Sequence, residues 1–262
     1  MNTRALGNTG IITAPIGLGT VKLGRVAGLK FARVPTVLPS DDEALVLLGA
    51  ARDLGVTLID TSPAYGVSEA RLGELLGRVA GADQWTLCTK AGETFDEVSG
   101  ESSHDFSAGA IRASIERSLV RLRVKRVDIA LLHFSSGAMD AEVLERGEAM
   151  GALEGLKREG KCRVIGASIG SLEGGRLAIE LGCDVVMVTL NALDRSMEPV
   201  IEAAAARGVG VLIKKALGSG RAAAGSSVGM VVNTPGVGAA VVGTTSAAHL
   251  REAVEAARGR AT

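Results

Sequence analysis

The feature that most constrains the fold of this chain is a regular alternation of short, β-branched apolar runs with segments of helical spacing. The two patterns recur about every thirty residues. Eight apolar runs are candidate β-strands: residues 14–18, 56–59, 85–89, 127–132, 163–167, 185–190, 208–213 and 239–242. Strands buried on both faces of a parallel sheet read as nearly continuous apolar runs. Eight strand and helix units in 262 residues therefore predict one α/β domain over residues 1–262, a (β/α)8 TIM barrel, with a doubly wound sheet as the alternative.

Local signals indicate where helices begin and end. Ser40 and Glu43 form a capping-box pattern, in which each side chain can bond to the backbone of the other residue. Gly55 supplies the matching stop, and Ser107 can cap the start of another helix. Ahead of the first strand, residues 7–10 (Gly-Asn-Thr-Gly) predict a short N-terminal β-hairpin that closes the bottom of the barrel.

The balance of charge limits the partners that this chain is expected to bind. Lys plus Arg and Asp plus Glu both number 29, so the formal net charge is zero, and no long block of like charge occurs. Nucleic acid and acidic lipid are therefore not expected as partners. We expect a monomer or a weak homo-oligomer that acts on a small molecule.

Membrane insertion and secretion are also not expected. Residues 222–248 carry no charge, but glycines, Asn233 and Pro235 interrupt them, so a short helix, a turn and a strand are predicted there instead of a membrane span. The first seven residues lack the apolar run of a secretory signal. Cys88, Cys162 and Cys183 are odd in number and far apart, which favours free thiols in a reducing cytoplasm.

Four chemically active side chains lie at or just after consecutive predicted strands. Asp60 follows the second strand, Tyr65 lies five residues later, Lys90 follows the third strand and His133 the fourth. Tyr65 is the single tyrosine of the chain. Reactive groups of a (β/α)8 barrel gather where strands end, so these four are expected at one mouth. Each has an ordinary alternative role as a helix cap, a solvated amine or a structural hydrogen-bonding group. Their convergence favours a catalytic site.

This combination suits the protonation of a carbonyl oxygen as a hydride reaches its carbon. An isolated phenol has a pKa near ~10, and a neighbouring ammonium is expected to lower the pKa of Tyr65. Asp60 would keep Lys90 charged, and His133 can hydrogen-bond the same substrate oxygen and fix its position. Tyr65 is then the candidate general acid.

Residues 60–76 resemble the main signature of the aldo/keto reductase family, with Asp60 and Tyr65 at the family spacing and a helix opening at Ser68 and Glu69. The likeness covers nearly the whole chain and continues through residues 17–20, 89–90, 118–122, 128–133, 159–168 and 242–252. The resemblance implies a TIM barrel and a nicotinamide cofactor. It also implies Tyr65 as general acid, Asp60 and Lys90 as groups that tune it, and His133 as the group that orients the carbonyl.

The same resemblance implies a set of cofactor-binding residues. Those expected around the nicotinamide are Gly19, Thr20, Ser168, Met187 and Lys214. Those expected around the pyrophosphate, the 2′-phosphate and the adenine are Lys215, Leu217, Ser219, Gly243, Thr244, Thr245, His249 and Glu252. Hydroxyls and an imidazole at a helix start can receive a phosphate, so NADPH is the expected cofactor (NADP in its oxidised form), with NADH as the alternative. We expect no metal ion.

Several positions depart from the family pattern. Ile169 stands where Asn is expected and Met187 where Gln is expected, so two amide groups that would hold the nicotinamide are missing. Asn191 or a main-chain group compensates, or the nicotinamide is held more loosely. Lys214 takes the place of an aromatic ring that stacks on the nicotinamide, and a cation there would disfavour the oxidised cofactor.

The leading expectation is an NAD(P)H-dependent oxidoreductase that reduces an aldehyde or ketone to an alcohol. Two alternatives stay open at this point. Lys90 at a strand end could attack a carbonyl, as in a Schiff-base aldolase, which predicts an adduct trappable with borohydride. The barrel could instead be retained as a cofactor-sensing or partner-binding protein.

Overall fold

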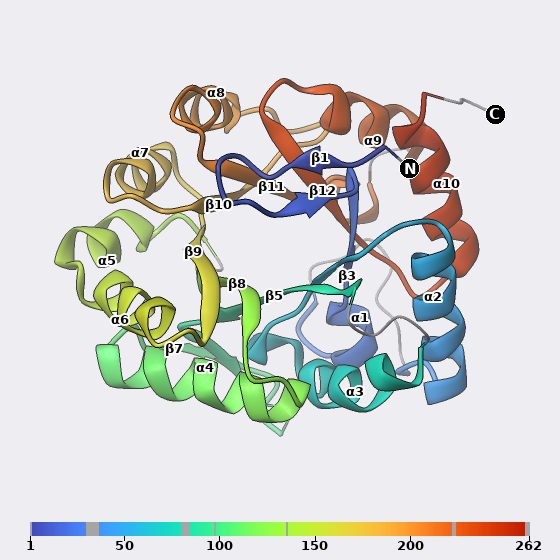
Figure 1. Ribbon diagram of the computed structural model, residues 1–262, viewed down its shortest axis with the longest axis horizontal. Helices are drawn as coiled ribbons and strands as arrows, with labels where there is room; N and C mark the ends of the chain where they lie inside the picture. Colours follow the sequence, from blue (N-terminus) through green and yellow to red (C-terminus); the bar gives the residue numbers. More distant parts are fainter. Residues whose placement is uncertain are drawn as a thin grey trace.

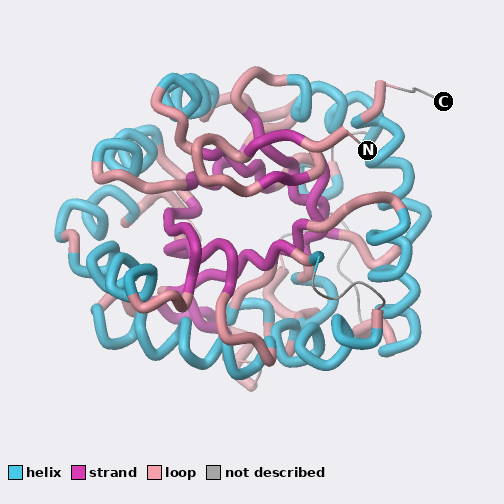
Figure 2. The backbone as a smooth tube through the Cα atoms, viewed as in Figure 1, coloured by secondary structure: helices cyan, strands magenta, loops and turns pink. Residues whose placement is uncertain are grey.

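A closed barrel of eight parallel strands forms the centre of the fold, and helices surround it (Figures 1 and 2). The computed structural model describes residues 2–29, 37–79, 84–96, 98–134, 136–221 and 224–259. The barrel strands are β3 (Ile16–Gly19), β4 (Leu58–Asp60), β5 (Thr86–Ala91), β8 (Val127–His133), β9 (Cys162–Ser168), β10 (Val185–Thr189), β11 (Gly210–Lys214) and β12 (Val237–Gly243). They follow one another in chain order, and β12 pairs with β3 to close the ring. All eight predicted strands are confirmed, and the doubly wound alternative is wrong.

Most of the helices pack against the outside of the barrel, and a few short ones lie at its carboxyl-terminal end. The α-helices are α1 (Val21–Gly24), α2 (Asp41–Asp53), α3 (Ser68–Leu75), α4 (Ala108–Leu122), α5 (Asp140–Arg146), α6 (Glu148–Arg158), α7 (Leu172–Glu180), α8 (Glu198–Ala206), α9 (Ala224–Asn233) and α10 (Ala247–Ala257), and the 3-10 helices are η1 (Pro63–Tyr65), η2 (Leu76–Arg78) and η4 (Gly218–Gly220).

The capping box predicted at Ser40 and Glu43 is confirmed. Ser40 Oγ accepts from the Glu43 amide at 3.2 Å, and the Glu43 carboxylate accepts from the Ser40 amide at 2.8 Å. Ser107 caps α4 on one side only, because its Oγ accepts from the Ala110 amide at 3.3 Å. The uncharged stretch forms α9 and β12, as predicted. Among the residues described, no helix has the length and apolar character needed to cross a bilayer.

The barrel strands read as continuous apolar runs in the sequence because both of their faces are buried. In β8, Ile129 and Leu131 belong to a cluster inside the barrel, whereas Ala130 and Leu132 belong to the larger cluster between the barrel and its helices. Successive side chains of a strand point to opposite faces, and here both faces are buried. The aliphatic residues that dominate the composition therefore fill both cores.

The predicted N-terminal hairpin is confirmed and closes the amino-terminal end of the barrel. β1 (Arg4–Ala5) pairs antiparallel with β2 (Ile12–Thr13), and in Figure 1 the two lie across the barrel near β11 and β12. Leu6 and Ile11 are fully buried in the interior cluster. Gly7 has φ +55°, and a Cβ there would lie 2.5 Å from the Gly208 carbonyl oxygen, so the turn needs glycine.

A second hairpin follows β5 and lies outside the predicted elements. β6 (Glu93–Phe95) pairs antiparallel with β7 (Ser102–His104). Each strand has three residues, Glu-Thr-Phe in β6 and Ser-Ser-His in β7, which is too short for a readable periodicity. The hairpin places Glu93 and Phe95 just beyond Lys90 at the carboxyl end of the barrel.

Candidate active site

Strand register brings the predicted functional residues to one end of the barrel. Gly19 lies opposite Asp60, His133 opposite Ser168, and Gly243 opposite Gly19. A cavity of about 540 Å³ opens at this end, and its walls include Asp60, Tyr65, Lys90 and His133. All four predicted catalytic side chains therefore meet at one cavity.

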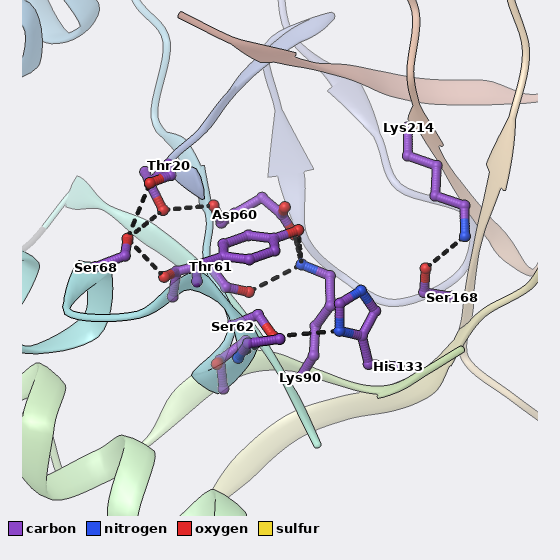
Figure 3. A network of polar contacts seen from close by, with 12 residues as sticks. Thr20, Asp60, Thr61, Ser62, Ser68, Lys90, His133, Ser168 and Lys214 are labelled. Carbon is purple, nitrogen blue, oxygen red and sulfur yellow. Dashed lines mark hydrogen bonds and ion pairs between the residues drawn. The ribbon is translucent and has the colours of Figure 1, made fainter. Parts of the chain in front are cut away.

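The ammonium of Lys90 is the centre of this group. Its Nζ donates to Asp60 Oδ1 at 2.6 Å, to the Thr61 carbonyl oxygen at 2.9 Å and to Tyr65 Oη at 3.3 Å (Figure 3). The Lys90 and Asp60 side chains are 1% and 4% exposed. Three acceptors satisfy the three donors of an ammonium, so a full charge is held at the floor of the cavity.

Burial and charge act in opposite directions on the pKa values of this group. Burial lowers the pKa of Lys90, but Asp60 and the other neighbours outweigh it and raise the pKa above its ordinary value. The predicted lowering of the phenol pKa is wrong. Burial raises the pKa of Tyr65 to about 12, and the opposing effect of Lys90 does not overcome it. Tyr65 therefore keeps its proton at neutral pH and can act as a donor.

The imidazole of His133 lies beside the phenol of Tyr65, and the carboxylate of Glu93 lies next to its Nδ1 atom. The rings of Tyr65 and His133 meet edge to face, with centroids 6.0 Å apart. Nδ1 of His133 lies 3.0 Å from Glu93 Oε2 and 3.3 Å from Ser62 Oγ. Burial, with Lys90 and other cations nearby, lowers the pKa of His133 well below its usual range, so the imidazole is neutral at neutral pH.

Most of the predicted cofactor residues line the same cavity. Those on its walls are Gly19, Ser168, Met187, Lys214, Lys215, Leu217, Ser219, Gly243, Thr244, His249 and Glu252. Thr20 and Thr245 are not among the lining residues. Thr20 is fully buried behind the wall, where its hydroxyl donates to the Asp60 carbonyl oxygen at 2.9 Å, and Thr245 is exposed at the start of the loop into α10.

Lys214 and Ser168 both line the cavity, and their side chains are hydrogen-bonded to each other. Nζ of Lys214 donates to Ser168 Oγ at 2.9 Å (Figure 3). Burial, with Lys215 and Lys90 adding repulsion, lowers the pKa of Lys214 to about 7. Asn191 does not line the cavity. Its side-chain amide donates to the Lys215 carbonyl oxygen and supports the loop that follows β11.

That loop has an unusual backbone. Lys215, Gly218 and Ser219 have φ of +56°, +54° and +59°, and two of these three are not glycine. The amides of Gly218 and Gly220 donate to the carbonyl oxygens of Lys215 and Leu217, so these turns fix the shape of the loop from within. Lys215, Leu217 and Ser219 therefore reach the cavity from a tightly turned segment.

Several functional neighbours were missed from the sequence. Glu93 is the most important, and the signal for it was an acid three residues after Lys90 in the loop beyond the third strand. Val21, Lys22 and Val241 also line the cavity. They belong to α1 and β12, and the sequence alone did not show which faces of these elements point inward.

Comparisons with known proteins agree on one family. A model of the aldo/keto reductase family matches residues 15–230. L-galactose dehydrogenase of Arabidopsis thaliana is 37% identical over 167 residues, which are 62% of this chain and 47% of that protein. The NADH-specific methylglyoxal reductase of Escherichia coli is 30% identical over 206 residues, 74% of this chain and 60% of that protein. The chain spans about half the length of the curated relatives it matches. A crystal structure described as an aldo-keto reductase from Pseudomonas aeruginosa superposes with a TM-score of 0.88 at 44% identity, over 98% of this chain and 95% of that chain.

Proposed function

The chain belongs to the aldo/keto reductase family, and from that premise we propose that it is an NADPH-dependent oxidoreductase that interconverts a small aldehyde or ketone with the corresponding alcohol. The observation that carries this proposal is the Lys90 ammonium, which bonds to both Asp60 and Tyr65 on the floor of the cavity. It is an arrangement for moving one proton at Tyr65 Oη.

The protein's part in the reaction is the handling of that proton. A bound nicotinamide would supply hydride to the carbonyl carbon, or would accept hydride from the alcohol carbon in the reverse direction. Tyr65 gives its proton to the substrate oxygen, and the charged Lys90 stabilises the phenolate that remains. Asp60 keeps Lys90 charged throughout, and His133 hydrogen-bonds the substrate oxygen next to the phenol.

The cavity walls suit a phosphorylated dinucleotide. Lys214 and Lys215 bring positive charge to one side, and His249 adds an imidazole at the start of α10. The amino-terminal end of α10 favours anions, and its first turn carries no acidic residue. These features support NADPH over NADH, as a preference and not as an exclusion.

Lys214 is proposed to set the preference between the two redox forms. Its Nζ, bonded to Ser168, occupies the side of the cavity assigned to the nicotinamide. A cation there repels the positive ring of the oxidised form and not the neutral reduced ring. In Lys214→Met the ratio of the dissociation constants for oxidised and reduced cofactor should fall toward one. An unchanged ratio would show that Lys214 has no such effect.

The function is tested by two measurements made in sequence. Titration with NADPH and with NADH, followed by cofactor fluorescence, should show binding, with NADPH the tighter ligand. The bound complex should then turn over members of a panel of small aldehydes and ketones. Absence of binding by either cofactor would overturn the proposal. Binding without turnover across the panel would favour the cofactor-sensing alternative.

The state of Lys90 disfavours the aldolase alternative. A Schiff base needs a neutral amine, whereas Lys90 is paired with Asp60 and its pKa is raised. Treatment with borohydride and a carbonyl compound should therefore leave no adduct on Lys90, which mass spectrometry of a peptide digest can show. The free, buried thiols of Cys88, Cys162 and Cys183 further support placing the enzyme in the cytoplasm.

A further inference from the structure

Lys214 and Ser168 form a polar pair at the carboxyl ends of two barrel strands. Val164 of β9 and Leu212 of β11 belong to the cluster inside the barrel. Side chains alternate along a strand, so Ser168 and Lys214, which end the same two strands, also point inward. Both line the cavity, and Lys214 Nζ donates to Ser168 Oγ at 2.9 Å (Figure 3). The pair is therefore part of the cavity wall.

The amine of Lys214 keeps hydrogens that no described residue accepts. An ammonium has three donors. Ser168 Oγ accepts one of them, and within the described ranges the amine makes no other hydrogen bond and no ion pair. Loss of one proton would still leave the amine a hydrogen to donate. A half-buried donor without an acceptor costs free energy, so this position suits an oxygen of a bound ligand.

Strand register places this donor close to the proposed proton-transfer site. Ser168 lies opposite His133 in the pairing of β9 with β8. In Figure 3 the Lys214–Ser168 pair lies beyond His133 as seen from Lys90. The carboxamide of a nicotinamide is carried by the ring carbon next to the one that transfers hydride. A ring that delivers hydride to a carbonyl beside Tyr65 and His133 must therefore place its carboxamide near that site but not in it.

We propose that Lys214 binds the carboxamide of the nicotinamide through its carbonyl oxygen, with Ser168 holding the amine in position. An ammonium can only donate, so it faces the oxygen of the carboxamide and not its amino group. The neighbouring side chains cannot replace this contact, because Ile169 is apolar and Met187, opposite Ser168 in β10, carries only a thioether. This inference rests on the proposed function and names the residue that recognises the reactive end of the cofactor.

Lys214 then has two separable effects on cofactor binding. The contact with the carbonyl oxygen is available to both redox forms, because hydride transfer does not change the carboxamide. Repulsion of the ring by the ammonium depends on the charge of the ring and acts on the oxidised form alone. A comparison among cofactors of equal ring charge therefore isolates the contact with the carbonyl oxygen.

The test uses three oxidised dinucleotides of equal ring charge: NADP, its thionicotinamide analogue and its 3-acetylpyridine analogue. The first analogue has sulfur, a weak acceptor, in place of the carbonyl oxygen. The second keeps the oxygen and has a methyl group in place of the amino group. Isothermal titration calorimetry gives the dissociation constants for wild type and Lys214→Met without substrate. The variant keeps the apolar stem and removes a half-buried charge, so it is expected to fold.

In Lys214→Met, NADP and the acetylpyridine analogue should lose the same contact, whereas the thionicotinamide analogue has little to lose. The ratio of the thionicotinamide dissociation constant to that of NADP should fall by roughly tenfold or more, as for a hydrogen bond to a charged group. The acetylpyridine ratio should not change. An unchanged thionicotinamide ratio would overturn the proposal and would leave a substrate oxygen as the partner of Lys214. A change in the acetylpyridine ratio alone would also overturn it, since Lys214 would then recognise the amino group.

Lys215→Met is the matched control. Lys215 is an exposed lysine on the same cavity wall, and its loss should weaken all three dinucleotides equally. If it changed the thionicotinamide ratio as much as Lys214→Met does, the assignment to Lys214 would be wrong.

Infrared spectroscopy of bound NADP with a ¹³C-labelled carboxamide gives a second readout. The carbonyl stretch should lie at lower frequency in wild type than in Lys214→Met, and equal frequencies would refute the contact. Failure of the proposed function would look different, because wild type would then bind none of the three dinucleotides.

Discussion

Replacing Lys214 by Met should stabilise the folded protein near neutral pH. The pKa of Lys214 falls from 10.5 to about 7 in the folded chain, and at roughly 1.36 kcal/mol per pKa unit this difference corresponds to an upper limit of about 5 kcal/mol. The side chain is half-buried and faces a cavity that water can enter, so a smaller penalty of about 1–3 kcal/mol is expected after solvent screening. Met removes this penalty while keeping the apolar stem.

The sign of the pH dependence identifies the cause. Below about pH 7, Lys214 is charged in both the folded and the unfolded chain, so the folded state bears the whole cost of burying the charge. Between about pH 7 and 10.5 Lys214 loses its proton in the folded chain only, and this cost decreases. Above about pH 10.5 Lys214 is neutral in both states and the cost is absent. Urea unfolding of wild type, Lys214→Met and the exposed control Lys125→Met at about pH 6 and about pH 10 tests this. The advantage of Lys214→Met should shrink at the higher pH, and Lys125→Met should show none. An equal advantage at both pH values would mean that packing, and not charge, is responsible.

Three further substitutions test other parts of the structure. Tyr65→Phe should leave cofactor affinity nearly unchanged while turnover falls by roughly 10²- to 10⁴-fold, and a near-normal rate would assign the proton to another group. Asp60→Asn should lower the free energy of unfolding by about 3–5 kcal/mol, because the buried Lys90 ammonium loses its counter-charge, and Asp60→Asn/Lys90→Met should regain part of that loss in the same urea titration. Gly166→Ala should abolish or severely weaken folding, because its Cβ would lie 1.7 Å from the Val185 carbonyl oxygen. The control is Gly151→Ala on the exposed face of α6, where a Cβ meets nothing within 4 Å. Circular dichroism should show that this control folds normally.

The barrel was readable from the sequence because its strands are buried on both faces. Runs such as residues 127–132 stay apolar without interruption, and the Ser40 and Ser107 caps mark helix starts independently. β6 and β7 were not predicted, since each has only three residues and contains no apolar run that would mark it as a strand. The ends of the predicted strands differ from the observed ones by up to two residues, because tertiary pairing and not propensity decides where a strand stops.

The sequence predicted which residues form the site, but it did not predict the direction in which the pKa of Tyr65 is shifted. Asp60, Tyr65, Lys90 and His133 could be collected because each follows a strand. The direction of the Tyr65 pKa depends on how deeply the phenol is buried, and a sequence does not show this. Glu93 in β6 lies 3.0 Å from His133 at the end of β8, which is a contact between segments forty residues apart. Such contacts are set by three-dimensional packing.

The N-terminal hairpin has a kinetic consequence. Leu6 and Ile11 fill the amino-terminal end of the barrel. Cofactor and substrate must therefore reach Lys90 and Tyr65 through the carboxyl-terminal mouth. Two reactants that share one entrance cannot exchange independently, since whichever lies deeper must enter first and leave last. Steady-state measurements should accordingly show a compulsory order of addition and release.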